Sequence, residues 1–433
     1  MKKYVYITIL ILFIGSVLIE SLGLLDNLER VEANEKEFEQ VKHMEIVKSI
    51  NIIPQTKEFE QVVIFNDPQP FYIKEDSLIK IGQLEPNVEF TIVQEKENFY
   101  ELLFGHVTVY VEKIGTVFQK KSLKSMINTE VSGAIKTTAQ TMVYEAPNNK
   151  SPQLLQLDVG FRYPIVGQVD DWFLIKVGER SGYIHKQTVQ LDEGIPVLVY
   201  HHILPKALMK KTTSTISAES FEQQMDYLAA HQFKTIGSHE MYEYKEGRKI
   251  LPINTVLITF DDGLLSTKEY AYPLLKKHQF RAIQHIISSR THRTEGIQTF
   301  DSEGKLQFFT EEEMAIMSDV FIYEAHTFDL HILNEETKVG KLMEVSAEEL
   351  EVDLRKNLEE IPNAISLAYP FGHYKEETIE VMKDLGFLLG FTTKTGYANM
   401  EDPNYEIKRF GVTEVVMMEE FINYVQGEML FPE

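Results

Sequence analysis

Four apolar stretches in the C-terminal half of the chain end in side chains that can do chemistry. These endings are His201-His202 after IPVLVY, Asp261-Asp262 after TVLITF, His326 and His331 in DVFIYEAHTFDLH, and the Pro370-Phe371-Gly372 turn after AISLAY. Short apolar runs that stop at polar residues are typical of buried strands. Imidazole and carboxylate groups bind divalent cations and transfer protons. The four endings are therefore candidates for one catalytic site.

The sequence around these runs alternates in character. From about Gly194 onward, strand-like runs alternate with amphipathic stretches such as ESFEQQMDYLAAHQ and EETIEVMKDLG, which predicts a β/α domain over residues 194–433. In a parallel β/α barrel the carboxyl ends of the strands converge on one face, and that face carries the active site. We therefore expect the four endings to point into one pocket.

The residue types at these endings suit metal-assisted hydrolysis. One carboxylate and two imidazoles can hold Zn²⁺ or a similar divalent ion, and three protein ligands leave a position for water and substrate. Such an ion lowers the pKa of its water from about 16 towards 7, and a second carboxylate can then take the proton. The chain contains no cysteine, so a metal site must use His, Asp or Glu.

Each motif alone also has a simpler interpretation. FDDG can be a turn in which an aspartate caps the following helix. His326 and His331 are five residues apart, a spacing that does not place them on one helical face, so they need a loop or a strand-to-turn geometry to meet. His201-His202 can be an ordinary strand end. The metal-site hypothesis therefore depends on all four endings occurring together.

Residues 194–420 resemble the NodB-type polysaccharide deacetylases of carbohydrate esterase family 4. TFDDG (Thr259–Gly263) is similar to the first motif of that family, HTFDLH (His326–His331) to its histidine motif, and YPFG (Tyr369–Gly372) to its third motif. The spacing of the two histidines and the strand that ends at Tyr200-His201 resemble the subgroup that deacetylates poly-β-1,6-N-acetylglucosamine. The resemblance covers just over half of the chain and implies a distorted β/α barrel.

The resemblance also implies roles for individual residues. It implies one divalent metal ion, Zn²⁺ by default with Co²⁺, Ni²⁺ or Mn²⁺ as alternatives, held by Asp262, His326 and His331. Asp261 is the expected general base. The late LxH motif that supplies the general acid in the wider family is missing here. In the subgroup that this chain resembles, the acid looks to be supplied by the strand that ends in Tyr-His, which points to His201. The neighbouring His202 is a less favoured candidate, since it lies on the other face of a regular strand.

The third motif is expected to bind the reacting group of the substrate. Tyr369, Pro370 and Phe371 are the expected oxyanion and substrate-binding residues, with the backbone N–H near Phe371 as a donor. The wider family has an arginine two residues before this proline to orient the base, and Ala368 stands there in this chain. Arg409, in the run IKRFGV, is the candidate that takes over this task.

The expected function is the removal of N-acetyl groups from N-acetylglucosamine units of an extracellular or cell-wall polysaccharide, with poly-β-1,6-N-acetylglucosamine favoured. Metal-activated water attacks, with an Asp base and a His acid. One alternative is the same reaction on peptidoglycan, which Ala368 in place of the family's arginine and the missing DxxDW motif make less favoured. The other is a polysaccharide-binding wall protein without activity, against which the intact Asp261, Asp262, His326 and His331 set argues.

The N-terminal half predicts an extracytoplasmic, multidomain protein. Residues 1–25 contain two lysines and a charge-free run of sixteen residues, so they are a cleaved signal peptide or a retained anchor helix, and 26–60 is a polar linker. Either fate of the apolar segment places the rest of the chain outside the cytoplasm. The net charge of −23 argues against nucleic-acid binding.

Two all-β segments follow, over residues 61–125 and 131–191. The second resembles a bacterial SH3-like domain, and the residues that carry the resemblance are Val143-Tyr144, Gly160, Asp171-Trp172 and Gly182-Tyr183-Ile184. The first is a weaker match. Such modules often hold an enzyme to cell-wall polymer, which suggests peptidoglycan as a partner, while a spacer without a ligand is the alternative. Trp172 is expected in the core or groove of this module.

Overall fold

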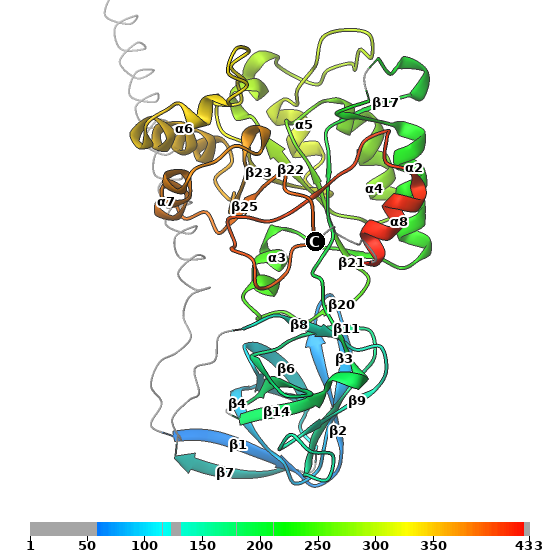
Figure 1. The fold of residues 1–433 in the computed structure, drawn as a ribbon, viewed down its shortest axis with the longest axis vertical. Coiled ribbons are helices and arrows are strands. Elements are labelled where there is room, and N and C mark those ends of the chain that lie inside the picture. The colour runs from blue at the N-terminus through cyan, green and yellow to red at the C-terminus, as the bar shows by residue number, and fades with distance from the viewer. Residues whose placement is uncertain (1–58, 115, 123–130, 179, 211, 428–433) are drawn as a thin grey trace, which may run out of the picture. The chain divides into compact units, whose positions relative to one another are not determined.

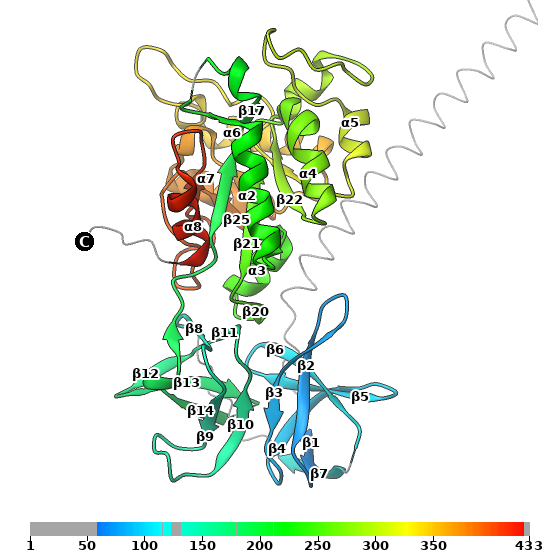
Figure 2. The same ribbon diagram turned by 90° about the vertical axis from the view of Figure 1, so that its right-hand side faces the viewer.

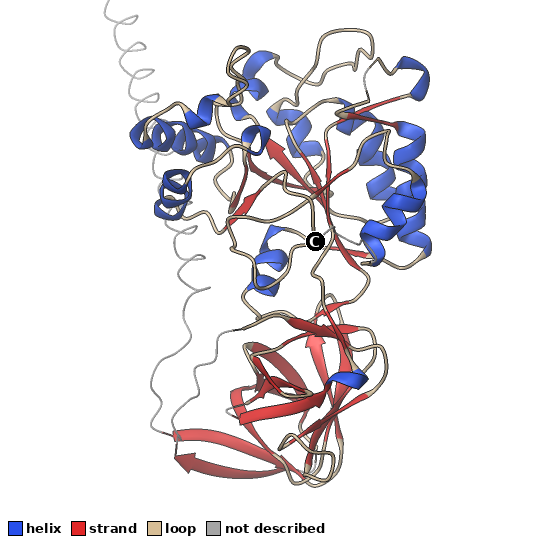
Figure 3. Ribbon diagram, viewed as in Figure 1, coloured by secondary structure: helices blue, strands red, loops and turns tan. Residues whose placement is uncertain are grey.

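The computed structural model describes residues 59–114, 116–122, 131–178, 180–210 and 212–427. The predicted signal or anchor segment lies outside the described residues, as does nearly all of the predicted linker. Among the helices that are described, none is both long and apolar enough to cross a membrane. The described chain divides into a β-rich N-terminal region and an α/β C-terminal region (Figures 1 and 3).

The N-terminal region is built from antiparallel strands. Its strands are β1 (Phe59–Phe65), β2 (Gln69–Lys74), β3 (Leu78–Leu84), β4 (Glu89–Glu95), β5 (Phe99–Phe104), β6 (Val107–Glu112), β7 (Thr116–Ser122), β8 (Ala134–Lys136), β9 (Thr141–Tyr144), β10 (Gln153–Leu157), β11 (Phe161–Pro164), β12 (Gly167–Val169), β13 (Trp172–Val177), β14 (Arg180–His185) and β15 (Gln190–Leu191). Buried and less buried residues alternate along β5 and β6, as expected for strands with one face on a core.

The two predicted β segments share one sheet and one core. Twelve of the described strands form a single hydrogen-bonded path, in the order β12-β13-β14-β9-β10-β3-β2-β6-β5-β4-β1-β7. The pairing of β10 with β3 joins the second segment to the first, and Leu155 lies opposite Leu84 there. Trp172 is 9% exposed and meets Tyr144 and His185 edge-on. The SH3-like assignment of both segments stays a prediction.

The C-terminal region contains a parallel sheet with helices around it (Figure 2). The sheet order is β25-β24-β23-β22-β21-β16-β26, and every pairing along it is parallel. The bounds are β16 (Val197–Tyr200), β21 (Thr255–Phe260), β22 (Ala282–Ile286), β23 (Phe321–Ala325), β24 (Ser366–Ala368), β25 (Leu389–Phe391) and β26 (Phe410–Gly411). β16, β21 and β22 are buried at every residue, which is typical of a sheet covered on both faces.

Helices and short strands complete this region. They are β17 (His202–Leu204), β18 (Thr215–Ser217), α2 (Ala218–Ala230), β19 (Lys234–Thr235), α3 (Ser238–Lys245), β20 (Leu251–Pro252), α4 (Tyr272–Lys277), α5 (Glu311–Ile316), α6 (Ala347–Glu360), α7 (Glu376–Asp384) and α8 (Met418–Gln426). Ser346 caps α6 in a capping box with Glu349. A parallel bridge from Phe391 to Ile407 connects β25 to the segment that leads into β26, so the sheet curls towards its own far edge.

Candidate active site

The four predicted strand endings lie at the same edge of the parallel sheet. Tyr200 of β16 is level with Phe260 of β21, so the next residues of the two strands, His201 and Asp261, leave the sheet together. On the neighbouring strands, Ala325 is level with Leu367. His326 follows Ala325 and donates a hydrogen bond from Nδ1 to the carbonyl oxygen of Ala368, at 2.7 Å. The register of the strands thus positions the polar side chains.

Asp262, His326 and His331 bring three ligand atoms together. The Nε2 atoms of His326 and His331 lie 3.5 Å and 3.3 Å from Oδ1 of Asp262. This oxygen is buried, and no described residue forms a hydrogen bond with it. Ligands at about 2.1 Å from a tetrahedral Zn²⁺ stand roughly 3.4 Å apart. The donor set and its spacing therefore fit a divalent ion.

The protonation states also suit metal ligands. Burial, with a smaller contribution from His326, lowers the pKa of His331 to about 4 and keeps its imidazole neutral at pH 7. Burial opposes ionisation of Asp262, but the imidazoles of His326, His201 and His331 outweigh it and lower the pKa of Asp262 to about 2. Metals bind neutral imidazole and ionised carboxylate. His326 has its Nδ1–H bonded to a carbonyl, which leaves Nε2 as the ligand atom.

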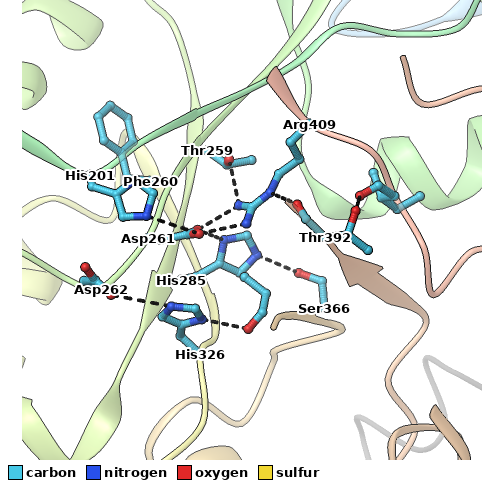
Figure 4. A network of polar contacts seen from close by, with 12 residues as sticks. His201, Thr259, Phe260, Asp261, Asp262, His285, His326, Ser366, Thr392 and Arg409 are labelled. Atoms are coloured by element: carbon cyan, nitrogen blue, oxygen red, sulfur yellow. Dashed lines mark hydrogen bonds and ion pairs between the residues drawn. The ribbon is translucent and has the colours of Figure 1, made fainter. Parts of the chain in front are cut away.

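A tight turn after β21 brings both aspartates into the site (Figure 4). Asp262 has φ 76° and Gly263 has φ 73°, so both residues are in the left-handed region. This conformation is uncommon for a residue with a side chain and tends to occur at functional sites. At Gly263 a Cβ atom would also lie 3.0 Å from the side chain of Ile286. The turn explains how adjacent residues can both face the same site.

Helix α6 holds the turn that carries His331. Thr327 has φ 68°, and the backbone N–H groups of Phe328 and Asp329 each donate to the carboxylate of Asp353 at 2.8 Å. One turn further along α6, the amide of Asn357 donates to the carbonyl of Thr327 at 2.8 Å. This strand-to-turn geometry brings His331 beside His326, with ring centroids 4.7 Å apart.

Asp261 is held by Arg409 and a buried histidine. The guanidinium forms two hydrogen bonds of 2.8 Å, from NH1 to Oδ1 and from NH2 to Oδ2. Nδ1 of His285 lies 3.1 Å from Oδ1 (Figure 4). Burial opposes ionisation of Asp261, but Arg409 and then His285 and His326 hold its pKa well below the usual value. Asp261 is therefore a carboxylate, able to accept a proton.

The two adjacent histidines after β16 have different surroundings. Nε2 of His201 lies 4.0 Å from Oδ2 of Asp261, and its side chain is 35% exposed. Nδ1 of His202 lies 2.8 Å from Oγ of Ser266, and burial lowers the pKa of His202. Of these two histidines, His201 is the one beside Asp261.

The third motif contributes one accessible residue to the site. Phe371 has φ 59° and is 37% exposed, and its ring lies tilted against that of His331 with a centroid distance of 4.3 Å. Pro370 and Tyr369 are buried, and the hydroxyl of Tyr369 donates to the carbonyl of Tyr405 at 2.9 Å. Of the three residues predicted to bind substrate, only Phe371 has a substantially exposed side chain.

Three residues of this region were not identified from the sequence: His285, Asp353 and Asn357. The strand AIQHI was not recognised because two of its five residues are polar, although a histidine within a buried strand is itself an unusual feature. Asp353 and Asn357 lie on the buried face of α6 together with Leu350 and Leu354. Polar residues among the apolar positions of an amphipathic helix could have indicated them.

A parallel α/β sheet with a candidate metal site and an ionised carboxylate at its carboxyl edge is suited to metal-assisted hydrolysis. Residues 248–390 match the family model described as polysaccharide deacetylase. This match places a polysaccharide deacetylase domain in the C-terminal part of the chain.

Several curated relatives and solved structures are similar to part of this chain. A poly-beta-1,6-N-acetyl-D-glucosamine N-deacetylase of Staphylococcus epidermidis is 29% identical over 204 residues, which cover 46% of this chain and 68% of the relative. The protein of the same name from Staphylococcus aureus is 28% identical over 207 residues, with the same coverage. The structure of IcaB from Ammonifex degensii is 26% identical and covers 54% of this chain and 98% of its own, with a TM-score of 0.46. The Streptococcus pyogenes deacetylase PplD is 21% identical and covers 53% and 97%, with a TM-score of 0.46.

Proposed function

We propose that this protein removes N-acetyl groups from N-acetylglucosamine units of an extracellular polysaccharide of the poly-β-1,6-N-acetylglucosamine type, outside the cytoplasm. The names of the staphylococcal relatives support the substrate. The observation that carries the chemistry is the arrangement of the two adjacent carboxylates. Asp261 is ionised and held by Arg409, while Oδ1 of Asp262 is buried beside two imidazoles without a hydrogen bond from the described residues.

In this proposal Asp262, His326 and His331 hold one divalent ion, with Zn²⁺ as the first candidate. Co²⁺, Ni²⁺ and Mn²⁺ also accept a set of one carboxylate and two imidazoles. When bound, the ion polarises the acetamide carbonyl and makes a water molecule more acidic. The three ligands come from the segments that follow β21 and β23, and β22 lies between these strands in the sheet.

The side chains then move two protons. Asp261 takes a proton from the attacking water through Oδ2, the oxygen nearer to His201. The backbone N–H of Phe371 donates to the acetamide oxygen while it gains negative charge. His201 gives a proton to the amide nitrogen as the C–N bond breaks. The products are acetate and a glucosamine unit that remains in the polymer.

The β-rich region is proposed to attach the enzyme to wall polymer. Its supporting feature is the group of Trp172, Tyr144 and His185, whose rings meet edge-on. Cosedimentation of the full-length protein with purified peptidoglycan tests this proposal, and Tyr144→Ala is expected to reduce the bound fraction. No binding by either form would leave the region as a spacer, and equal binding by both forms would mean that this aromatic group is not the contact.

Acetate release tests the proposed reaction. The purified protein is incubated with poly-β-1,6-N-acetylglucosamine oligomers and, in parallel, with peptidoglycan, before and after treatment with a chelator and after readdition of Zn²⁺. We expect acetate from the β-1,6-linked oligomers, loss of release with the chelator and recovery with the metal. Release from peptidoglycan alone would reassign the substrate. A fully metal-loaded protein that releases acetate from neither would be a binding protein.

A further inference from the structure

His285 is a buried histidine whose position among apolar neighbours calls for an explanation. It lies on β22, between β21 and β23, and is 0% exposed. Its ring packs 5.2 Å from the ring of Phe391, measured between centroids. A buried polar group costs free energy unless it is hydrogen-bonded. An apolar side chain would fill this position without that cost, so the imidazole is expected to have a task.

Both ring nitrogens of His285 have partners (Figure 4). Nδ1 lies 3.1 Å from Oδ1 of Asp261, and Nε2 lies 3.4 Å from Oγ of Ser366. The carboxylate of Asp261 already faces the guanidinium of Arg409, and an ionised carboxylate can only accept hydrogen bonds. The hydrogen between His285 and Asp261 is therefore on Nδ1. This contact fixes the tautomer of His285 and leaves Nε2 as an acceptor.

The two carboxylate oxygens of Asp261 receive different numbers of hydrogen bonds. Oδ1 receives two hydrogen bonds, from NH1 of Arg409 and from Nδ1 of His285. Oδ2 receives one, from NH2 of Arg409, and lies 4.0 Å from Nε2 of His201 at the accessible side of the site. Oδ1 is thus closed by protein donors, while Oδ2 keeps a lone pair for another partner.

We propose that His285 is a positioning residue for the deacetylation reaction. Its Nδ1–H holds Oδ1 of Asp261, so that Oδ2 is the oxygen that accepts the proton of the attacking water. The inference rests on the proposed function, in which Asp261 is the base. Arg409 alone binds the two oxygens symmetrically, at 2.8 Å each. Among the hydrogen bonds to Asp261, the one that distinguishes the two oxygens is the one from His285.

Two substitutions separate this role from a role in packing. In His285→Asn the amide nitrogen is attached to Cγ, as Nδ1 is, and can keep the hydrogen bond to Asp261. In His285→Gln the amide nitrogen is one bond further out, where Nε2 lies, so the donor to Asp261 is lost. Both variants replace the ring by an amide, and both are expected to destabilise the core to a similar degree. His285→Phe keeps a ring and removes both nitrogens.

The measurement is kcat and KM for acetate release by the full-length protein, with zinc affinity by calorimetry and Tm for each variant. Loss of an outer hydrogen-bond partner in such sites costs about 10- to 100-fold, so we expect this loss in kcat for His285→Gln and His285→Phe, and no more than about 3-fold for His285→Asn. KM and zinc affinity are expected to stay near those of the unsubstituted protein in all three variants.

The opposite results would overturn the inference. Equal kcat losses in the Asn and Gln variants would show that the ring itself matters rather than its Nδ1–H, and no loss in the Gln variant would remove the role entirely. Losses that follow zinc affinity would mean that His285 acts through the neighbouring metal ligands. If the zinc-loaded, unsubstituted protein releases no acetate, the proposed function fails, and this inference fails with it.

Discussion

Among the described residues, two groups of three side chains could each hold a metal ion, and they differ in burial and in the contacts of their ligand atoms. In the first, Asp262, His326 and His331 lie at the carboxyl edge of the sheet; the second is the exposed group of His292, Glu311 and Glu360. In both, the ligand atoms lie within 4.8 Å of one another. Proximity alone therefore does not distinguish a metal site from an ordinary surface group.

The difference lies in what each atom already binds. Both ring nitrogens of His292 face glutamate oxygens, at 3.1 Å from Glu311 and 3.1 Å from Glu360. A ring nitrogen that points its hydrogen at a carboxylate offers no lone pair to a metal, and the ring needs a hydrogen on each nitrogen to donate to both glutamates. In the buried group, His326 uses Nδ1 for a carbonyl and keeps Nε2 for the site, and Oδ1 of Asp262 has no hydrogen bond from the described residues. A metal site is therefore recognised by ligand atoms whose lone pairs are not used in hydrogen bonds within the protein.

The largest effect is expected when a ligand of the buried group is removed. Asp262→Ala takes away the carboxylate that the two imidazoles face, so we expect zinc binding to be lost and acetate release to fall by more than about 100-fold. Calorimetric zinc titration and acetate release measure the two effects. Zinc binding by Asp262→Ala with unchanged affinity would contradict the assignment of Asp262, His326 and His331 as the metal site.

Next in size is the loss of the partner of the other carboxylate. Arg409→Met leaves Asp261 buried without its guanidinium, which costs about 3–5 kcal/mol of stability. The pKa of Asp261 is expected to rise, because Arg409 is the main group that lowers it. Activity needs the ionised form, so the acid limb of kcat/KM is expected to move to higher pH. Tm and the pH profile of kcat/KM measure these effects.

A double substitution provides the control. In Arg409→Met with Asp261→Leu, neither charge remains, and replacing both members of a buried pair by apolar groups is often neutral for stability. Stability is therefore expected to return while activity stays absent. If the double variant is as unstable as Arg409→Met, packing of the long arginine side chain, rather than the buried charge, explains the loss.

A smaller effect is expected from the helix that positions His331. Asp353→Asn keeps the size of the side chain but replaces one acceptor oxygen by a donor, which conflicts with the N–H of Phe328 or Asp329. Zinc affinity is expected to fall by about 10-fold because the turn of His331 loosens. Glu351→Ala, at an exposed position of the same helix that binds Arg355, is the matched control and is expected to keep full affinity. Equal zinc affinities in the two variants would mean that α6 does not position His331.

The comparison also shows which parts of the site the sequence could predict. The endings at His201 and Asp261 were found because each follows a largely apolar run, and such runs are typical of fully buried strands such as β16 and β21. His326 follows a run that contains one charged residue, Glu324. Arg409 was suggested by a family resemblance and not by its spacing, since it lies 148 residues from Asp261. Contacts between distant residues leave no local pattern in a single sequence.

For the fold as well, local patterns could be predicted from the sequence, and contacts between distant segments could not. The alternation of strands and helices after Gly194 was predicted from local patterns and is found in the structure. The pairing of β10 with β3, which joins the two predicted β segments, was not predicted because alternating strands do not specify their neighbours. His285 was missed for a related reason. The strand of His285 is too polar to be found as an apolar run, and the role of His285 depends on its contact with Asp261, 24 residues away.

The smallest effect is expected at the exposed group, and it is the sharpest test of the comparison. His292→Ala removes a histidine whose side chain is 46% exposed and whose two nitrogens are engaged by glutamates. We expect the same number of zinc ions per chain as in the unsubstituted protein and unchanged acetate release, whereas His331→Ala is expected to lose one ion. Metal analysis of the two variants after equilibration at limiting zinc decides this. Loss of an ion in His292→Ala would mean that an imidazole placed between two carboxylates can still hold a metal, and that lone pairs left open by the protein are not what sets the buried group apart.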